Sequence, residues 1–240
     1  MMNCRKPAAS GKKRVGWKLI PSSMALANSS KRPPPLCQFG LMAPSIAHSP
    51  FDRLRANGMS YDAMKTAMTA AYAVEIVQFL SDNGISVQVD GGWGVDALLG
   101  EQTRSHVDLD IGMQHKDVPR LRELLESTGY KEIARDDSWE CNFVLADEFG
   151  HEIDVHSCTF DADGNNVFGV AYPAESLTGT GTIEGYQVDC VPPEWMVKFH
   201  SGYELKMSDY CDVSALCERF GIELPSEYDK FREDLSGSAI

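Results

Sequence analysis

Two aspartates one residue apart are the first residues of this sequence that could do chemistry. Asp108 and Asp110 stand in the segment HVDLDIGM, where acids alternate with apolar residues. This alternation predicts a strand with Val107, Leu109 and Ile111 on one face and both acids on the other. Two carboxylates on one strand face repel each other unless a cation lies between them, and Mg²⁺ in proteins commonly takes one or two carboxylates plus phosphate oxygens and water. The alternative is an ordinary solvated strand face.

Two further segments favour the cation site. Asp154 stands between Ile153 and Val155 in the segment HEIDVH. On a neighbouring strand it could complete a two-metal site or accept a proton from an attacking hydroxyl. Gly91 and Gly92 follow a predicted strand and precede a predicted helix, so their backbone N–H groups could approach a phosphate at the helix N-terminus. Together these segments favour a site that holds a divalent cation and phosphate.

Three more polar residues are candidates with open alternatives. Arg104 could bind phosphate through its planar fork, or it could cap a helix or pair with Glu101. His156 is two residues after Asp154 and would share its strand face, but it could equally be a satisfied buried histidine. His106 is either a site residue or an ordinary residue at the start of a strand.

The elements that would position these residues can be read from apolar spacing and from turn residues. Helical spacing from Met64 to Leu80 ends at Asn83-Gly84, a good C-terminal stop. The segments FDADGNN and TGTGTIEG resemble a calcium loop and a dinucleotide fingerprint, but their spacing is wrong for either, and both are interpreted as turns. The predicted helices are 61–84, 93–100, 116–130, 194–205 and 208–221, and the predicted strands are 85–89, 106–113, 141–147 and 151–157.

The motif GGW…TR.H.DLDI resembles the signature of the polymerase-β-type nucleotidyltransferase superfamily, in its antibiotic-modifying branch. From about residue 72 to 228 the chain is most similar to the lincosamide nucleotidyltransferases, with the aminoglycoside 2″-adenylyltransferases more distant. The segments that carry the resemblance are VDGGWGVDALLGEQTR, DLDI, QHKDVPRLRELL, HEIDVH, NNVFGVAYP, SLTGTGTI and PEWMVKFHSGYEL. The resemblance implies an α+β fold with a polymerase β-like mixed-sheet domain at 61–192 and a helical region at 193–240.

The resemblance also implies an activity and a set of site residues. The activity is transfer of AMP, or another NMP, from Mg-NTP to a hydroxyl of a lincosamide, with release of pyrophosphate. An aminoglycoside acceptor and a non-catalytic nucleotide-binding module are the alternatives. The implied site residues are Gly91, Gly92, Arg104 and Lys198 for the nucleotide, and Asp108, Asp110 and Asp154 for catalysis and for two Mg²⁺ ions.

Two of these assignments carry alternatives. The aminoglycoside relatives have a second acid two residues after the position of Asp154, where this chain has His156. The base is therefore either Asp154 or His156. Lys198 resembles the lysine that the superfamily often directs at the triphosphate, but it could also be a surface lysine with a buried stem.

Charge separates the start of the chain from the rest. The first sixty residues hold ten basic residues and one acid, against 12 basic and 34 acidic residues in the remainder. Such an acidic body repels nucleic-acid phosphates and attracts cations. Residues 1–60 are expected to be a disordered basic extension, with a transit-like peptide and a nucleic-acid arm as alternatives. The expected partners are an antibiotic and an NTP, without nucleic acid or membrane, and a homodimer is left open.

Cysteine use and hydropathy bear on the compartment. The seven cysteines include no C-x-x-C pair, which favours free thiols in a reducing compartment. No run of 18 or more apolar residues occurs, so no membrane span is expected. These observations favour a cytoplasmic protein.

Overall fold

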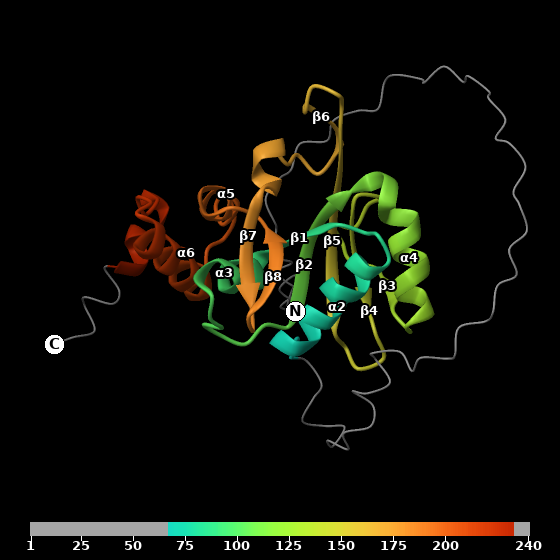
Figure 1. The fold of residues 1–240 in the computed structure, drawn as a ribbon. Helices are drawn as coiled ribbons and strands as arrows, with labels where there is room; N and C mark the ends of the chain where they lie inside the picture. Colours follow the sequence, from blue (N-terminus) through green and yellow to red (C-terminus); the bar gives the residue numbers. More distant parts are fainter. Residues whose placement is uncertain (1–66, 233–240) are drawn as a thin grey trace, which may run out of the picture.

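One mixed β-sheet organises the chain (Figure 1). The computed structural model describes residues 67–232, so the predicted extension at 1–60 lies outside the described residues. The strand order is β3-β4-β5-β2-β1-β8-β7, and β6 pairs with β5. Strand β2 is antiparallel to β1 and parallel to β5, which makes the sheet mixed. This confirms the predicted α+β fold.

Eight strands and five α-helices are found among residues 67–232. The strands are β1 Val87–Asp90, β2 Asp108–Gln114, β3 Lys131–Ile133, β4 Asn142–Ala146, β5 Glu152–Phe160, β6 Asn166–Gly169, β7 Gly179–Ile183 and β8 Tyr186–Cys190. The helices are α2 Ala70–Asp82, α3 Gly91–Leu99, α4 Val118–Ser127, α5 Pro193–Phe199 and α6 Met207–Phe220, with short 3₁₀ helices at His115–Asp117, Ala174–Leu177 and Ser226–Tyr228. No helix among residues 67–232 is long and apolar enough to cross a membrane.

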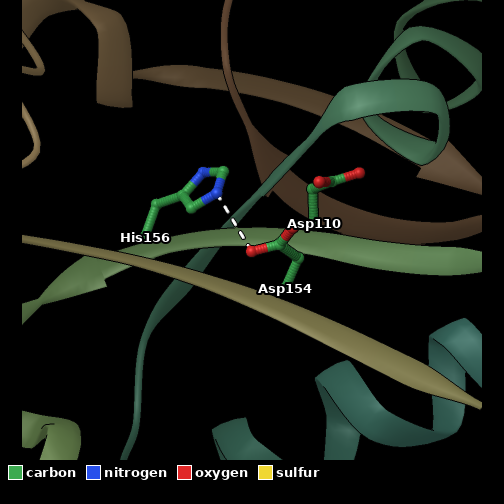
Figure 2. A group of neighbouring side chains, drawn as sticks. All are labelled: Asp110, Asp154 and His156. Carbon is green, nitrogen blue, oxygen red and sulfur yellow. Dashed lines mark ion pairs between the residues drawn. The ribbon is translucent and has the colours of Figure 1, made fainter. Parts of the chain in front are cut away.

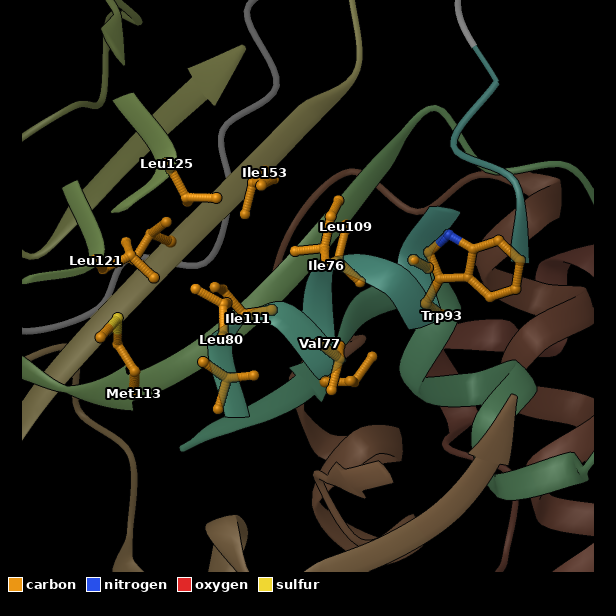
Figure 3. Packing of buried hydrophobic residues seen from close by; sticks show 14 of the residues in the cluster. Ile76, Val77, Leu80, Trp93, Leu109, Ile111, Met113, Leu121, Leu125 and Ile153 are labelled. Carbon is orange, nitrogen blue, oxygen red and sulfur yellow. The ribbon is translucent and has the colours of Figure 1, made fainter. Parts of the chain in front are cut away.

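Helices α2 and α4 cover one face of the sheet and bury its main core (Figure 3). Strand β2 contributes Leu109, Ile111 and Met113, all fully buried. The helices contribute, among others, Ile76, Leu80, Leu121 and Leu125. Because side chains alternate along a strand, this packing leaves Asp108, Asp110 and Gly112 on the opposite face. The predicted separation of acids from apolar residues on this strand is therefore confirmed from Leu109 onward.

Helix α3 connects the sheet to the C-terminal helices. Its Trp93 and Ala97 belong to the core under the sheet, whereas its Val95 belongs to a second core with residues of α5 and α6. Helix α3 thus packs against the sheet with one side and against α5 and α6 with the other, which holds these two helices close to α3.

Besides the predicted helix 194–205, which ends at Phe199 as α5, three sequence expectations are corrected by the structure. Helix α2 begins at Ala70, after the N-cap Thr69, and Met68 instead pairs in extended conformation with His106. Val107 is 55% exposed and precedes β2, so it does not share the buried face of that strand.

The third correction concerns TGTGTIEG, which forms strand β7 and the turn into β8. Its glycines misled the prediction because glycine usually weakens a strand. In this strand, close packing on α3 requires a glycine at position 181, since a Cβ there would collide with the backbone carbonyl of Ala97. The turn at DADGNN is confirmed: the Asp161 carboxylate accepts hydrogen bonds from the backbone N–H groups of Asp163 and Asn165.

Candidate active site

The strand register brings acidic residues into one row. Asp110 of β2 lies opposite Asp90 of β1 and opposite Asp154 of β5. His156 follows two residues later on β5, and its Nε2 lies 3.1 Å from Oδ1 of Asp154. Figure 2 shows Asp110, Asp154 and His156 together, and one ligand atom of each lies within 4.8 Å of the others. The sequence prediction that β2 and β5 are neighbours with converging acids is confirmed.

The first turn of α3 lies directly against Asp110. Gly91 has a φ of 56°, a left-handed conformation that glycine adopts easily. A Cβ on Gly91 would collide with the Asp110 carboxylate, and a Cβ on Gly92 would collide with the ring of His106 and with Arg104. The two glycines therefore allow the backbone to approach the acid row closely, at the N-terminus of a helix where anions are favoured.

A buried hydrogen-bond chain connects the glycine turn to β5. Asp90 caps α3 by accepting a hydrogen bond from the Gly91 N–H (2.8 Å), and its Oδ2 accepts one from the hydroxyl of Tyr172 (2.8 Å). The same hydroxyl lies 3.2 Å from Nδ1 of His156. Burial first, and then the charge of Asp90, raise the pKa of Tyr172 well above its usual value, so the hydroxyl keeps its proton.

The loop before β2 is held by a buried aspartate of α3. Oδ1 of Asp96 accepts hydrogen bonds from the backbone N–H of Thr103 (3.0 Å) and from its hydroxyl (2.6 Å), and Oδ2 pairs with Nε2 of His106. The His106 ring also packs on Trp93, with ring centroids 4.5 Å apart. In the described structure His106 is therefore a buried residue that fixes the loop carrying Arg104.

Arg104 joins this loop to helix α6. Its Nε and Nη2 donate to the buried carboxylate of Asp212, with the shortest distance 2.7 Å. Burial lowers the pKa of the Arg104 guanidinium, but Asp212, with Asp96 and Asp108, more than offsets this and raises it. The sequence alternatives for Arg104, a helix cap or a pair with Glu101, did not include this partner. The side chain is still 37% exposed, and phosphate binding by Arg104 stays a prediction.

Two further predicted residues, Asp108 and Lys198, also lie outside the group formed by Asp110, Asp154 and His156. Asp108 is half-buried on the same strand face as Asp110, in register with Glu152. Lys198 of α5 is exposed, and its ammonium lies 4.0 Å from the centre of the Trp195 ring. Metal binding by Asp108 and triphosphate binding by Lys198 stay predictions.

Sequence reasoning missed three residues at this site. Asp90 could have been found, because an aspartate directly before a helical Gly-Gly turn is a typical N-cap. Tyr172 gave no local signal. Asp212 was expected to cap a helix or to pair with Lys198, and the structure pairs it with Arg104 instead. Tyr172 is separated from Asp90 by 82 positions, and Asp212 is separated from Arg104 by 108.

The donor set suits a divalent cation. Asp110 and Asp154 supply carboxylate oxygens, which Mg²⁺ and Mn²⁺ prefer, and His156 supplies an imidazole nitrogen. Two neighbouring carboxylates with a helix N-terminus beside them could hold such a cation and the phosphates that it binds.

Comparisons with known proteins agree with this geometry. The sequence model of the family described as aminoglycoside-2″-adenylyltransferase matches residues 73–216. A protein named lincosamide resistance protein, from Staphylococcus haemolyticus, is 30% identical over 139 residues, which cover 55% of this chain and 84% of that protein.

Two solved structures have a similar fold. The lincosamide antibiotic adenylyltransferase LnuA, in its lincomycin-bound crystal structure, is 25% identical with a TM-score of 0.55, covering 62% of this chain and 97% of that chain. ANT(2″)-Ia in complex with adenylyl-2″-tobramycin is 17% identical with a TM-score of 0.54, covering 71% of this chain and 98% of that chain. The second similarity shows the fold alone.

Proposed function

Because this chain belongs to the aminoglycoside-2″-adenylyltransferase family, we propose that it transfers a nucleoside monophosphate from a nucleoside triphosphate to a hydroxyl of a lincosamide antibiotic. Pyrophosphate is the second product, and ATP is the expected donor. The observation that carries the proposal is the alignment of Asp110 with Asp154 beside the Gly91 turn.

The site residues take the following roles in this proposal. Asp110 and Asp154, with Asp108 beside them, would hold the Mg²⁺ ions, two by expectation, and bound Mg²⁺ would supply charge neutralisation at the transferred phosphate and the leaving pyrophosphate. The turn at Gly91 and Gly92 holds the phosphates at the start of α3. Arg104 and Lys198 are the proposed cationic partners of the rest of the triphosphate.

The reaction itself requires one bond exchange and one proton transfer. The acceptor oxygen bonds to the α-phosphorus while the bond from that phosphorus to the pyrophosphate oxygen breaks. The hydroxyl proton passes to Asp154 or to His156, which lie on one face of β5. The attacking and leaving oxygens must lie in line, so much of the rate depends on positioning.

The acceptor class follows from the relatives. A lincosamide is favoured because the curated relative at 30% identity is a lincosamide resistance protein. An aminoglycoside is the second candidate, since the matching family is described by that acceptor. Both acceptors carry amines, which suit a chain with a net charge of −13. The need for a nucleoside triphosphate as donor also favours a cytoplasmic location in this proposal.

A panel assay tests the proposal. The protein is incubated with Mg²⁺, ATP and, separately, lincomycin, clindamycin, kanamycin and tobramycin, and each product is analysed by mass spectrometry. We expect a mass increase of one AMP on lincomycin and clindamycin. An adduct on kanamycin or tobramycin alone would transfer the proposal to the aminoglycoside acceptor, and no adduct on any of the four would contradict it.

A further inference from the structure

The hydroxyl of Tyr172 lies between two polar groups of the site. It donates its single proton to Oδ2 of Asp90, because the ionised Asp90 carboxylate can only accept. The tyrosine oxygen can then only accept from the second neighbour, Nδ1 of His156, at 3.2 Å. All three side chains are at least nine-tenths buried.

This proton arrangement determines which nitrogen of His156 carries hydrogen. Nδ1 must hold the proton that it donates to Tyr172. In the neutral imidazole Nε2 is then the nitrogen with the lone pair. Nε2 is also the nitrogen that faces Asp154. Histidines that bind metals almost always donate their other N–H to a fixed partner in this way.

The spacing of the ligand atoms suits a shared cation. Adjacent ligands of an octahedral ion with bonds of about 2.1 Å are roughly 3.0 Å apart. Nε2 of His156 and Oδ1 of Asp154 are 3.1 Å apart. Asp110 completes the group, since one ligand atom from each of the three residues lies within 4.8 Å of the others.

We propose that His156 is a nitrogen ligand of a divalent cation that Asp110 and Asp154 also hold, and that Tyr172 is the positioning residue that orients it. The inference rests on the proposed nucleotidyl transfer and deepens it, since it leaves Asp154 as the residue that accepts the proton of the acceptor hydroxyl. A site with one imidazole favours Mn²⁺ over Mg²⁺ more than a site of carboxylates alone does.

The loop after β6 holds the Tyr172 side chain in its orientation. The side-chain amide of Asn166 donates to the backbone carbonyls of Val170 (2.7 Å) and Tyr172 (2.9 Å). The Tyr172 ring packs against Phe199 of α5, with centroids 5.5 Å apart. Because the loop and the helix both fix this ring, the hydroxyl is held at one position between Asp90 and His156.

Electron spin echo spectroscopy of bound Mn²⁺ tests the nitrogen ligand directly. The full chain is prepared with ¹⁵N-labelled histidine and measured with Mn²⁺ alone and with Mn²⁺ plus α,β-methylene-ATP, so adenine nitrogens are not confused with histidine. We expect ¹⁵N coupling that disappears in His156→Gln and persists in His115→Gln, a histidine bonded to Ser157 instead. Coupling that persists in His156→Gln would overturn the assignment.

The variant Tyr172→Phe tests the positioning role. It removes one hydroxyl and keeps the buried ring, so the fold should persist, as checked by circular dichroism. Loss of such an outer partner typically weakens metal affinity by about tenfold or more. We expect that loss for Mn²⁺ in calorimetric titration, together with weaker ¹⁵N coupling. Unchanged affinity and unchanged coupling would show that Tyr172 is only structural.

The outcomes separate this inference from the proposed function. If Mn²⁺ binds without histidine coupling and AMP is still transferred, the nitrogen ligand is wrong and the proposed function stands. If Mn²⁺ does not bind, with or without the nucleotide, and no AMP transfer occurs, both are wrong.

Discussion

Replacing Gly91 by alanine puts a methyl group against the Asp110 carboxylate. The new Cβ would lie 2.7 Å from Cγ of Asp110. Carbon atoms pack no closer than about 3.5 Å, so the carboxylate would have to retreat by roughly 0.8 Å. The backbone at Gly91 also has a φ of 56°, which costs a non-glycine residue about 1–2 kcal/mol.

These two effects have different consequences. A misplacement of about 1 Å at a reacting centre can cost roughly 10²-fold in rate, equivalent to about 2.7 kcal/mol. We therefore expect Gly91→Ala to lower kcat/KM for AMP transfer about 100-fold. The backbone strain should lower Tm by about 2–8 °C, at about 2–4 °C per kcal/mol for a chain of this size.

Gly84→Ala is the matched control. Gly84 has a φ of 77°, and a Cβ there would meet no atom within 4 Å. It should show a similar loss of Tm with unchanged kcat/KM, both measured at a temperature at which all variants are folded. Equal kcat/KM for Gly91→Ala and the wild type would refute the argument that the glycine turn must approach Asp110.

Three other perturbations have expected outcomes. Asp212→Asn removes one charge of the ion pair with Arg104. Because the Arg104 side chain is 37% exposed, we expect only about 0.5–1 kcal/mol lower stability in urea unfolding, with a raised KM for ATP. Burial raises the pKa of Asp147, but its hydrogen bonds with His151 outweigh this and lower the pKa below its usual value. The stabilisation from this carboxylate should therefore be fully present well above the unfolded pKa of about 3.9 and be lost as acid protonates it. Asp147→Asn should flatten a plot of Tm against pH between about 5 and 3. Asp96→Asn weakens charge-assisted hydrogen bonds worth about 1.5–3 kcal/mol, so Tm should fall by roughly 3–12 °C in calorimetry, and an unchanged Tm would contradict the role assigned to this buried acid.

The sheet and its acids could be predicted because their signals are local. The period-two pattern of β2, the hairpin of β4 and β5, and the glycine stop of α2 each depend on a few consecutive residues. Strand β7 was missed because its Thr and Gly residues resemble a turn. The need for Gly181 arises only when α3 packs on that strand, and no local pattern contains that contact.

The site residues also divide into those with a local sequence signal and those whose role depends on a contact distant in sequence. Asp110 and Asp154 were found because each stands in its own alternating segment, and the parallel pairing of β2 with β5 then follows from the fold. Tyr172 lies in a loop whose local sequence gives no sign of its partner Asp90. Arg104 was identified by type, but its partner on α6 could be known only from the packed structure.

The rate of AMP transfer by Asp110→Asn tests the central claim most directly. Asp110 and Asp154 are held in register as like charges that a divalent cation would bridge. We expect this variant, like Asp108→Asn, to lose about 10³-fold or more in Mg²⁺-dependent transfer from ATP to lincomycin, since metal stabilisation is worth several kcal/mol. Its Tm without metal should be equal or higher, because a like-charge repulsion is removed. Transfer at the wild-type rate by a folded Asp110→Asn protein would contradict the account.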